Sequence, residues 1–265
     1  MKLRALAPWL LCAAFSTGST FAQDWAKERL NKSPRHSEWI DLKHGDRTVK
    51  AFVVYPEVKT KAPAVLVIHE IFGLTDWAKN LADELAAAGY IAIAPDLLSA
   101  PGKETSSYPD QGAAIKAISA LPAAQVLADL DAAADYATKL PACSGTLAVT
   151  GFCWGGGWSF GYANHNPKLK AAYVFYGTGP KTKAEAENIK CPVYGFYAED
   201  DARVDETIPP TKEIMKSLGK TYEPEIYAGA GHGFMRAGEA PDASEANRKA
   251  HDAAWERWKS LLKKL

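Results

Sequence analysis

The sequence predicts an α/β fold in which a mostly parallel, twisted sheet carries helices on both faces. Strand-like and helix-like segments alternate along most of the 265 residues, and 47% of the residues are hydrophobic, enough for a large core. The segment P-A-V-L-V-I-H at 63–69 is nearly continuous in apolar residues, which is typical of a strand buried on both faces. No repeat, low-complexity tract or linker divides residues 23–265, so we expect one domain there.

The expected elements follow one another in a regular order. Strands at 38–44 and 48–55, joined by the turn H-G-D-R, predict an N-terminal antiparallel hairpin. After the strand at 63–69, a helix is expected to begin at a Thr75 cap and to end at Gly89. Further strands are expected at 90–95, 146–151, 169–176, 192–198 and 221–228. Further helices are expected at 122–140, after the glycine-rich turn near 153, at 207–218 and at 243–263. Residues 97–112 are expected to form the main irregular loop.

The N-terminal segment has the pattern of a secretory signal. Lys2 and Arg4 precede an apolar stretch at 5–15. A region of small and polar residues follows, and the expected cleavage position is after Ala22. The alternatives are a membrane anchor and an ordinary helix, but the apolar stretch is too short to span a bilayer. We therefore expect residues 1–22 to be a signal peptide and the protein to be exported, in a bacterium to the periplasm.

The charge balance points to a small-molecule partner. Lysine plus arginine and aspartate plus glutamate number 31 each, and no long run of one sign occurs. Such a chain has no electrostatic feature that would favour nucleic acid or an anionic membrane. We expect a monomer that binds neither.

Three cysteines follow the predicted signal, so at least one thiol is unpaired. Cys143 and Cys191 each precede a strand, and the strand at 169–176 is expected between them. Two strand spacings separate their Cα atoms by roughly 9 to 10 Å, beyond the roughly 7 Å limit of a disulfide. No bridge between them is expected.

The third cysteine lies in the stretch V-T-G-F-C-W-G-G-G at 149–157. A strand runs into Gly151, a thiol stands at Cys153, and glycines precede a helix, which is the pattern of a nucleophile elbow with cysteine in place of serine. The helix N-terminus behind it favours an anionic sulfur. The alternative is a buried structural cysteine at a glycine-lined packing contact.

A base and an acid are expected from the ends of other strands, because ligands bind beyond the carboxyl ends of parallel strands. His232, in A-G-A-G-H-G-F, is the one histidine that follows a strand after the candidate nucleophile and acid in chain order. Among the acids that follow strand 192–198, Asp201 is preferred over Asp200 because it precedes the short step A-R-V. Glu199 and Asp205 are further alternatives.

A thiol nucleophile also restricts the substrate. A thiolate beside an imidazole attacks activated acyl carbons readily, but it is a better leaving group than an amine. Esters and lactones are therefore favoured over amides. The cost is a nucleophile that can be oxidised between turnovers.

Together these segments resemble the dienelactone hydrolase family of the α/β-hydrolase superfamily, over about residues 38–263. The quotable motifs are H-E-I-F-G at 69–73, A-P-D-L at 94–97, G-F-C-W-G-G at 151–156, D-D-A-R-V at 200–204 and A-G-H-G-F-M-R at 230–236. The resemblance implies an α/β-hydrolase fold and a catalytic triad of Cys153, Asp201 and His232.

It implies further roles as well. Glu70 would contact the resting thiol and accept its proton when substrate arrives, and the backbone N–H groups of Ile71 and Trp154 would form an oxyanion hole. Arg236 would hold a substrate carboxylate. A second family arginine is replaced by Ala100, for which Lys103 on the same loop is a weak substitute.

The expected function is hydrolysis of a carboxylic ester or lactone through a Cys153 thioester, with no metal or organic cofactor. Two alternatives remain open at this point. One is a non-catalytic ligand-binding or thiol-sensing protein on the same fold, and the other is acyl transfer to an alcohol.

Overall fold

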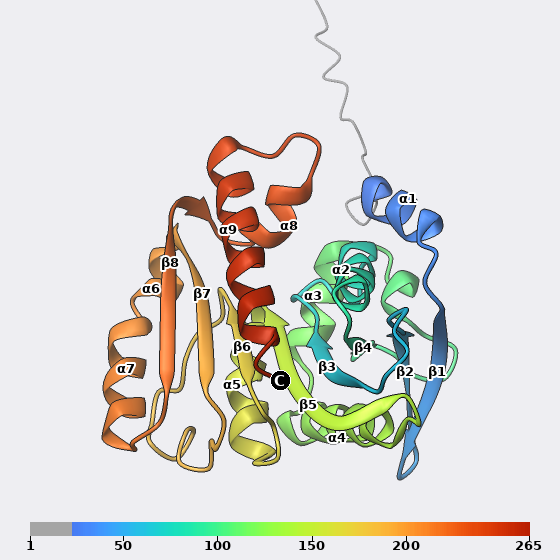
Figure 1. Ribbon diagram of the computed structural model, residues 1–265, viewed down its shortest axis with the longest axis horizontal. Coiled ribbons are helices and arrows are strands. Elements are labelled where there is room, and N and C mark those ends of the chain that lie inside the picture. Colours follow the sequence, from blue (N-terminus) through green and yellow to red (C-terminus); the bar gives the residue numbers. More distant parts are fainter. Residues whose placement is uncertain (1–22) are drawn as a thin grey trace, which may run out of the picture.

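The computed structural model describes residues 23–265, and the predicted signal peptide lies outside them. Its sheet has eight strands in the order β1-β2-β4-β3-β5-β6-β7-β8 (Figure 1). The strands are β1 (Ser37–His44), β2 (Arg47–Val54), β3 (Ala62–Ile68), β4 (Ile91–Pro95), β5 (Cys143–Phe152), β6 (Ala172–Phe175), β7 (Val193–Asp200) and β8 (Tyr222–Gly231). β1 and β2 form the antiparallel hairpin, β2 pairs antiparallel with β4, and the remaining pairs are parallel. The predicted mixed sheet is confirmed.

Helices cover both faces of this sheet, which confirms that part of the prediction. On one face lie α1 (Asp24–Lys32), α2 (Asp76–Ala87), α8 (Phe234–Glu239) and α9 (Glu245–Leu262). On the other lie α4 (Ala123–Lys139), α5 (Trp154–His165), α6 (Ala202–Asp205) and α7 (Ile208–Ser217). The short helix η1 (Thr105–Ser107) and α3 (Gln111–Ser119) lie in the connection between β4 and α4.

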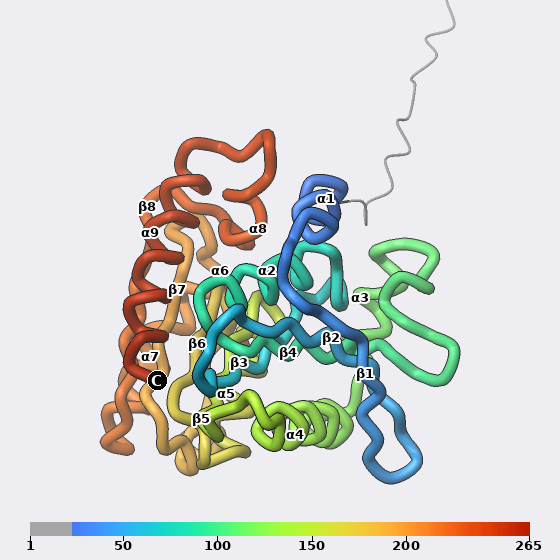
Figure 2. Tube along the Cα trace, turned by 45° about the vertical axis from the view of Figure 1, so that its right-hand side comes forward, coloured from blue at the N-terminus to red at the C-terminus, as the bar shows by residue number. Residues whose placement is uncertain are grey.

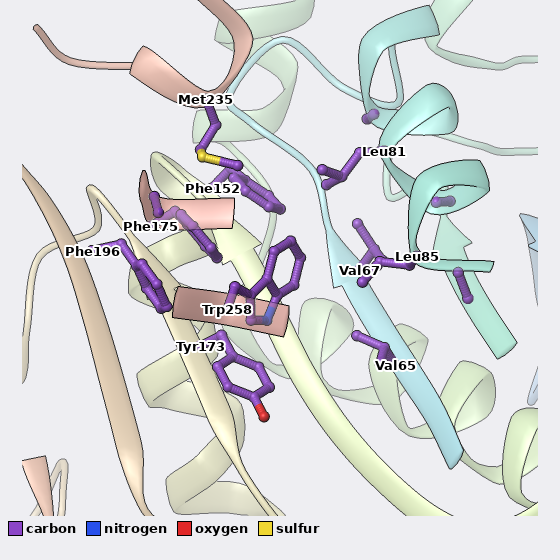
Figure 3. Packing of buried hydrophobic residues seen from close by; sticks show 14 of the residues in the cluster. Val65, Val67, Leu81, Leu85, Phe152, Tyr173, Phe175, Phe196, Met235 and Trp258 are labelled. Atoms are coloured by element: carbon purple, nitrogen blue, oxygen red, sulfur yellow. The ribbon is translucent and has the colours of Figure 1, made fainter. Parts of the chain in front are cut away.

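A row of stacked phenylalanine rings connects the neighbouring strands β5, β6 and β7. Phe152, Phe175 and Phe196 are register partners on β5, β6 and β7, and their rings stack with centroids 4.7 and 4.2 Å apart (Figure 3). Trp258 of α9 packs edge-on against Phe175 at 4.8 Å. Because stacked cross-strand aromatics add stability beyond the area they bury, this row holds the carboxyl ends of the three strands in register.

Glu239 of α8 links this helix to α1 and α2 on one face of the sheet. Its buried carboxylate accepts hydrogen bonds from Arg29 Nη1 at 2.8 Å and from Trp77 Nε1 at 2.9 Å. These contacts join α1, α2 and α8, and α1 runs alongside α2 (Figure 2). Since α8 follows His232 directly, the ion pair also anchors the segment that carries the predicted base.

Four α-helices were not expected from the sequence: α1, α3, α6 and α8. Each is short, and part of the predicted irregular loop at 97–112 is η1 and the first residues of α3. The α2 cap also differs from the prediction. Thr75 occupies the N-cap position without a side-chain bond, and Gln23 Oε1 instead accepts the Trp77 backbone N–H at 2.6 Å. A distant side chain thus replaces the local cap.

Cys143, Cys153 and Cys191 are free, as expected. β6 lies between β5, which begins at Cys143, and β7, which Cys191 precedes. Within residues 23–265, no single helix combines the length and apolar character needed to cross a bilayer. Only α3 and α4 taken together pass that test, and they meet at a bend of 98°.

Candidate active site

Cys153 occupies a sharp turn between β5 and α5. Its backbone angles are φ 55° and ψ −115°, which a residue with a side chain rarely adopts, and α5 begins at the next residue. The Cys153 backbone N–H donates to Phe175 O at 3.0 Å, and its carbonyl accepts the Gly156 N–H at 3.0 Å. Neighbouring structure therefore holds the strained thiol residue in place, as in a nucleophile elbow.

The glycines around the turn admit close approach of backbone. A Cβ on Gly155 would overlap the carbonyls of Ile68 and His69, at the end of β3. A Cβ on Gly156 would lie 2.6 Å from Phe175 O, and one on Gly151 would overlap the Gly155 carbonyl. The G-x-C-x-G-G spacing is thus a packing requirement that brings α5 against β3 and β6.

His232 and Asp201 are bonded to each other. The His232 ring lies beyond β8, and its Nδ1 hydrogen-bonds Asp201 Oδ2. The Asp201 side chain is only 7% exposed, whereas Glu199 and Asp200 are exposed and the Glu199 carboxylate accepts the Gly229 N–H. Of the candidate acids considered from the sequence, Asp201 is the one that bonds the His232 imidazole in the structure.

The Cys153 thiol lies close enough to the His232 ring to affect the pKa of that ring. Burial lowers the pKa of His232, but hydrogen bonding to Cys153 and to Asp201 raises it, and together with the charges of both residues the result is a pKa of about 9. At neutral pH the ring is therefore an imidazolium next to sulfur. A cation in that position favours the reactive thiolate form of a cysteine.

Glu70 lies beside this pair, buried at the end of β3. Its Oε2 accepts a hydrogen bond from Arg236 Nε at 2.8 Å, and its Oε1 accepts one from the Tyr176 hydroxyl at 3.4 Å. The resemblance implied a contact between Glu70 and the resting thiol. Within residues 23–265 the carboxylate bonds Arg236 and Tyr176 instead, so this geometry fits the arrangement in which Cys153 pairs with His232.

Tyr176 is a site residue that was not expected from the sequence. Its backbone φ of 39° is also in the left-handed region, and its fully buried ring packs edge-on against His232 with centroids 5.1 Å apart. Burial and the nearby Glu70 charge raise its pKa well above the ordinary value, so the hydroxyl keeps its proton. Its position at the carboxyl end of strand 169–176 was the one available signal.

The backbone N–H groups of Ile71 and Trp154 are free to bind an oxyanion. Neither donates a hydrogen bond to any residue in 23–265, and both residues line the same cavity as Cys153. Trp154 is also the first residue of α5, where the helix dipole is positive.

Side chains of the H-E-I-F-G and A-P-D-L motifs form hydrogen bonds that hold neighbouring loops in place. Leu97 N–H donates to His69 Nε2 at 3.3 Å, so Nδ1 carries the proton and donates to Glu70 O at 2.8 Å. Burial lowers the pKa of His69, which stays neutral in this bridge. Asp96 accepts bonds from the Thr105 N–H and hydroxyl, both at 2.7 Å. These bonds position the loop that bears the backbone of Ile71.

The loop that lacks the second family arginine lies away from the cavity lining. Ala100 pairs with Lys103 through backbone bonds of 3.0 and 2.8 Å, and the Lys103 ammonium lies 4.3 Å from the centroid of the Tyr108 ring. Neither Ala100 nor Lys103 lines the cavity. The predicted substitution of Lys103 for the missing arginine has no support in this arrangement.

The cavity next to Cys153 has a volume of about 620 Å³, and much of its lining is aromatic or aliphatic. The apolar lining residues are Ile71, Trp154, Trp158, Phe160, Tyr176 and Pro180. This size is within the range of small-molecule sites. Residues 23–265 contain no group of three or more potential ligands placed to hold a metal ion.

Known proteins are similar to this chain over most of its length. The sequence profile of the dienelactone hydrolase family matches residues 49–265. The chain belongs to the dienelactone hydrolase family. A candidate carboxymethylenebutenolidase of Methylorubrum extorquens is 36% identical over 200 residues, which cover 71% of this chain and 69% of that protein. One from Salmonella typhi is 34% identical over 211 residues, covering 75% of this chain and 77% of that protein.

Solved structures agree with the family assignment. A candidate dienelactone hydrolase of Klebsiella pneumoniae superposes with a TM-score of 0.75 at 30% identity, over 87% of this chain and 99% of that one. The dienelactone hydrolase of Anabaena variabilis, at 19% identity and a TM-score of 0.63, shows the shared fold over 83% of this chain and 95% of that one. The family's fold is the α/β-hydrolase fold, and the chain is a hydrolase. The alternative of a non-catalytic sensor is therefore not supported.

Proposed function

We propose that the protein hydrolyses a carboxylic ester or lactone with Cys153 as nucleophile, through a thioester. The observation that carries this proposal is the convergence of three segments. Cys153 at the strained turn lies close enough to the His232 imidazole to raise its pKa, and Nδ1 of that ring is bonded to buried Asp201. No metal or organic cofactor takes part in the proposed reaction.

The proposed reaction has two halves. In the first, the Cys153 thiolate attacks the carbonyl, the Ile71 and Trp154 N–H groups hold the oxyanion, and the His232 imidazolium gives its proton to the leaving alkoxide. In the second, neutral His232 takes a proton from water, the hydroxide attacks the thioester, and Cys153 leaves as thiolate with the acid as product. Asp201 keeps the imidazole in the tautomer that both halves need.

In this proposal Glu70, held by Arg236, controls the protonation of the Cys153 thiol. Glu70 is held by Arg236 and Tyr176 when Cys153 pairs with His232. We propose that Glu70 turns to the sulfur in the resting enzyme and accepts its proton as substrate enters. A role of Arg236 in holding a substrate carboxylate stays a prediction, because here its Nε is occupied by Glu70.

Trapping the thioester tests the proposal directly. When the enzyme is mixed with an aryl ester of a slowly hydrolysed acid and quenched in acid, intact-mass spectrometry is expected to show one added acyl group. Peptide mapping should place it on Cys153. An acyl group on a serine, or no acyl group during steady turnover, would contradict the cysteine mechanism. Cys191, a buried free thiol, is the internal control and should carry no acyl group. Adding an alcohol and measuring new ester separates acyl transfer from hydrolysis.

The pKa of His232 sets the expected dependence on pH. Because the pKa is raised to about 9, the imidazolium is present at neutral pH and is lost as the pH rises through about 9. We expect kcat/KM for an alkyl ester to fall above that pH, and to fall less for a p-nitrophenyl ester, whose leaving group needs no proton. The measurement is a pair of pH profiles on one enzyme preparation. Identical alkaline limbs for both esters would argue against His232 as the proton donor.

The untested parts of the sequence prediction belong to the same proposal. We propose that the chain is exported after removal of residues 1–22, that residues 23–265 act as one domain, and that this domain works as a monomer. The basic, apolar and small-residue order of the first segment supports export.

A further inference from the structure

Two exposed cations line the cavity next to Cys153, and we call their part of the lining the rim. Arg203 of α6 and Lys181 of the segment between β6 and β7 both line it, and both side chains are exposed. Tyr176, Thr178 and Glu185 supply the rest of the charged or hydroxyl lining. Most of the remaining lining residues are apolar or glycine.

Neither cation is neutralised by a carboxylate. The ion pairs formed within residues 23–265 include neither Arg203 nor Lys181, whereas Arg236 is paired with Glu70 at 2.8 Å. Glu185 is the one acid in the lining, and its Oε2 accepts the Lys181 backbone N–H at 2.7 Å. Within the lining, two cations therefore accompany a single carboxylate.

The positions of the strands separate Arg203 from the sulfur, whereas Lys181 follows β6, the strand next to β5. Cys153 follows β5 and Arg203 follows β7, with β6 between them. Two strand spacings amount to about 10 Å along the cavity. An anion held by Arg203 is therefore remote from the carbonyl under attack.

The catalytic residues indicate which half of an ester occupies the cavity. The acyl half stays attached to Cys153, which lines the cavity, and the oxyanion donors Ile71 and Trp154 line it too. His232, the proposed donor to the leaving alcohol, is not part of the lining. In the proposed reaction the alcohol departs toward His232, and the acyl half extends into the cavity that Arg203 lines.

We propose that Arg203 and Lys181 select an acyl group with an apolar body and a terminal carboxylate about 10 Å from the scissile carbonyl. This inference rests on the proposed ester hydrolysis and specifies its substrate class as a half-ester of a long dicarboxylic acid or the corresponding lactone acid. It assigns anion recognition to residues other than Arg236 and the loop around Ala100. Exposed cations contribute modestly, so each is expected to change selectivity by roughly threefold to tenfold.

The test compares two substrates that differ only in the terminal charge: the p-nitrophenyl half-ester of octanedioic acid and its p-nitrophenyl methyl diester. The wild-type ratio of kcat/KM, half-ester over diester, is expected to exceed one and to decline with added salt. Arg203→Gln and Lys181→Gln should each lower the ratio threefold to tenfold, mainly through KM, while diester hydrolysis is retained. Lys183→Gln, which removes a charge from the same segment outside the lining, should leave the ratio unchanged.

The outcomes separate this inference from the proposed function. Diester hydrolysis that is lost in Cys153→Ala supports the proposed function whatever the ratio shows. A wild-type ratio at or below one, or a ratio insensitive to both glutamine variants, overturns the rim assignment alone. A ratio that collapses in Arg236→Gln but not in Arg203→Gln would return carboxylate recognition to Arg236.

Discussion

Cys153→Ala is expected to lower kcat/KM for a chromogenic acetate ester by at least about 10⁴-fold, because removal of a nucleophile leaves only binding and the oxyanion hole. Alanine can keep the same backbone angles, and the neighbouring bonds are to backbone atoms, so the fold should persist. The measurement is initial-rate kinetics, with circular dichroism as the check on folding.

Cys191→Ala is the matched control for this variant. Cys191 is a buried thiol before β7, outside the lining of the cavity, and burial raises its pKa to about 11. Its loss is expected to leave esterase activity within a factor of about two after correction for folded protein. Turnover by Cys153→Ala at the wild-type rate would remove the nucleophile from the proposal.

Asp201→Asn is expected to lower kcat/KM by about 10³- to 10⁴-fold with little change in fold, since an amide cannot stabilise the imidazolium and favours the wrong tautomer. Asp201 also raises the pKa of His232. The alkaline fall in the remaining activity should therefore occur at a lower pH than in the wild type. Steady-state kinetics over pH 5 to 11 would measure both effects, on the scale of side-chain titration.

Asp200→Asn removes the same charge one residue earlier. Because Asp200 is exposed and does not contact the imidazole, its activity should stay within about twofold of wild type, as for most exposed surface changes. Equal losses in the two variants would mean that general electrostatics, and not the bond to His232, accounts for the effect.

Local sequence patterns were sufficient for much of the fold. Period-two and continuous apolar segments locate all eight strands, because burial on one or both faces leaves a direct record in residue type. The helices α1, α3, α6 and α8 have no comparable pattern in the sequence. Each is short, and its stability comes from contacts such as Arg29 with Glu239, between residues that are remote in sequence.

The candidate site was predictable to a similar extent. The glycine spacing around Cys153 reflects close backbone approach, and the chain order of Cys153, Asp201 and His232 follows from the fold class. Tyr176 was missed because its role depends on a strained backbone and on packing against His232. Neither property has a local signature.

The sequence by itself determined which residues stand at the carboxyl ends of the strands and which chemistry a thiol at the turn supports. Only the tertiary structure decided which acid meets the imidazole, that Glu70 pairs with Arg236, and that Arg203 lines the cavity. The physical reason is that periodicity and turn glycines are properties of neighbouring residues, whereas charge pairing and cavity shape arise when β3, β5, β7 and β8 end side by side at one edge of the sheet.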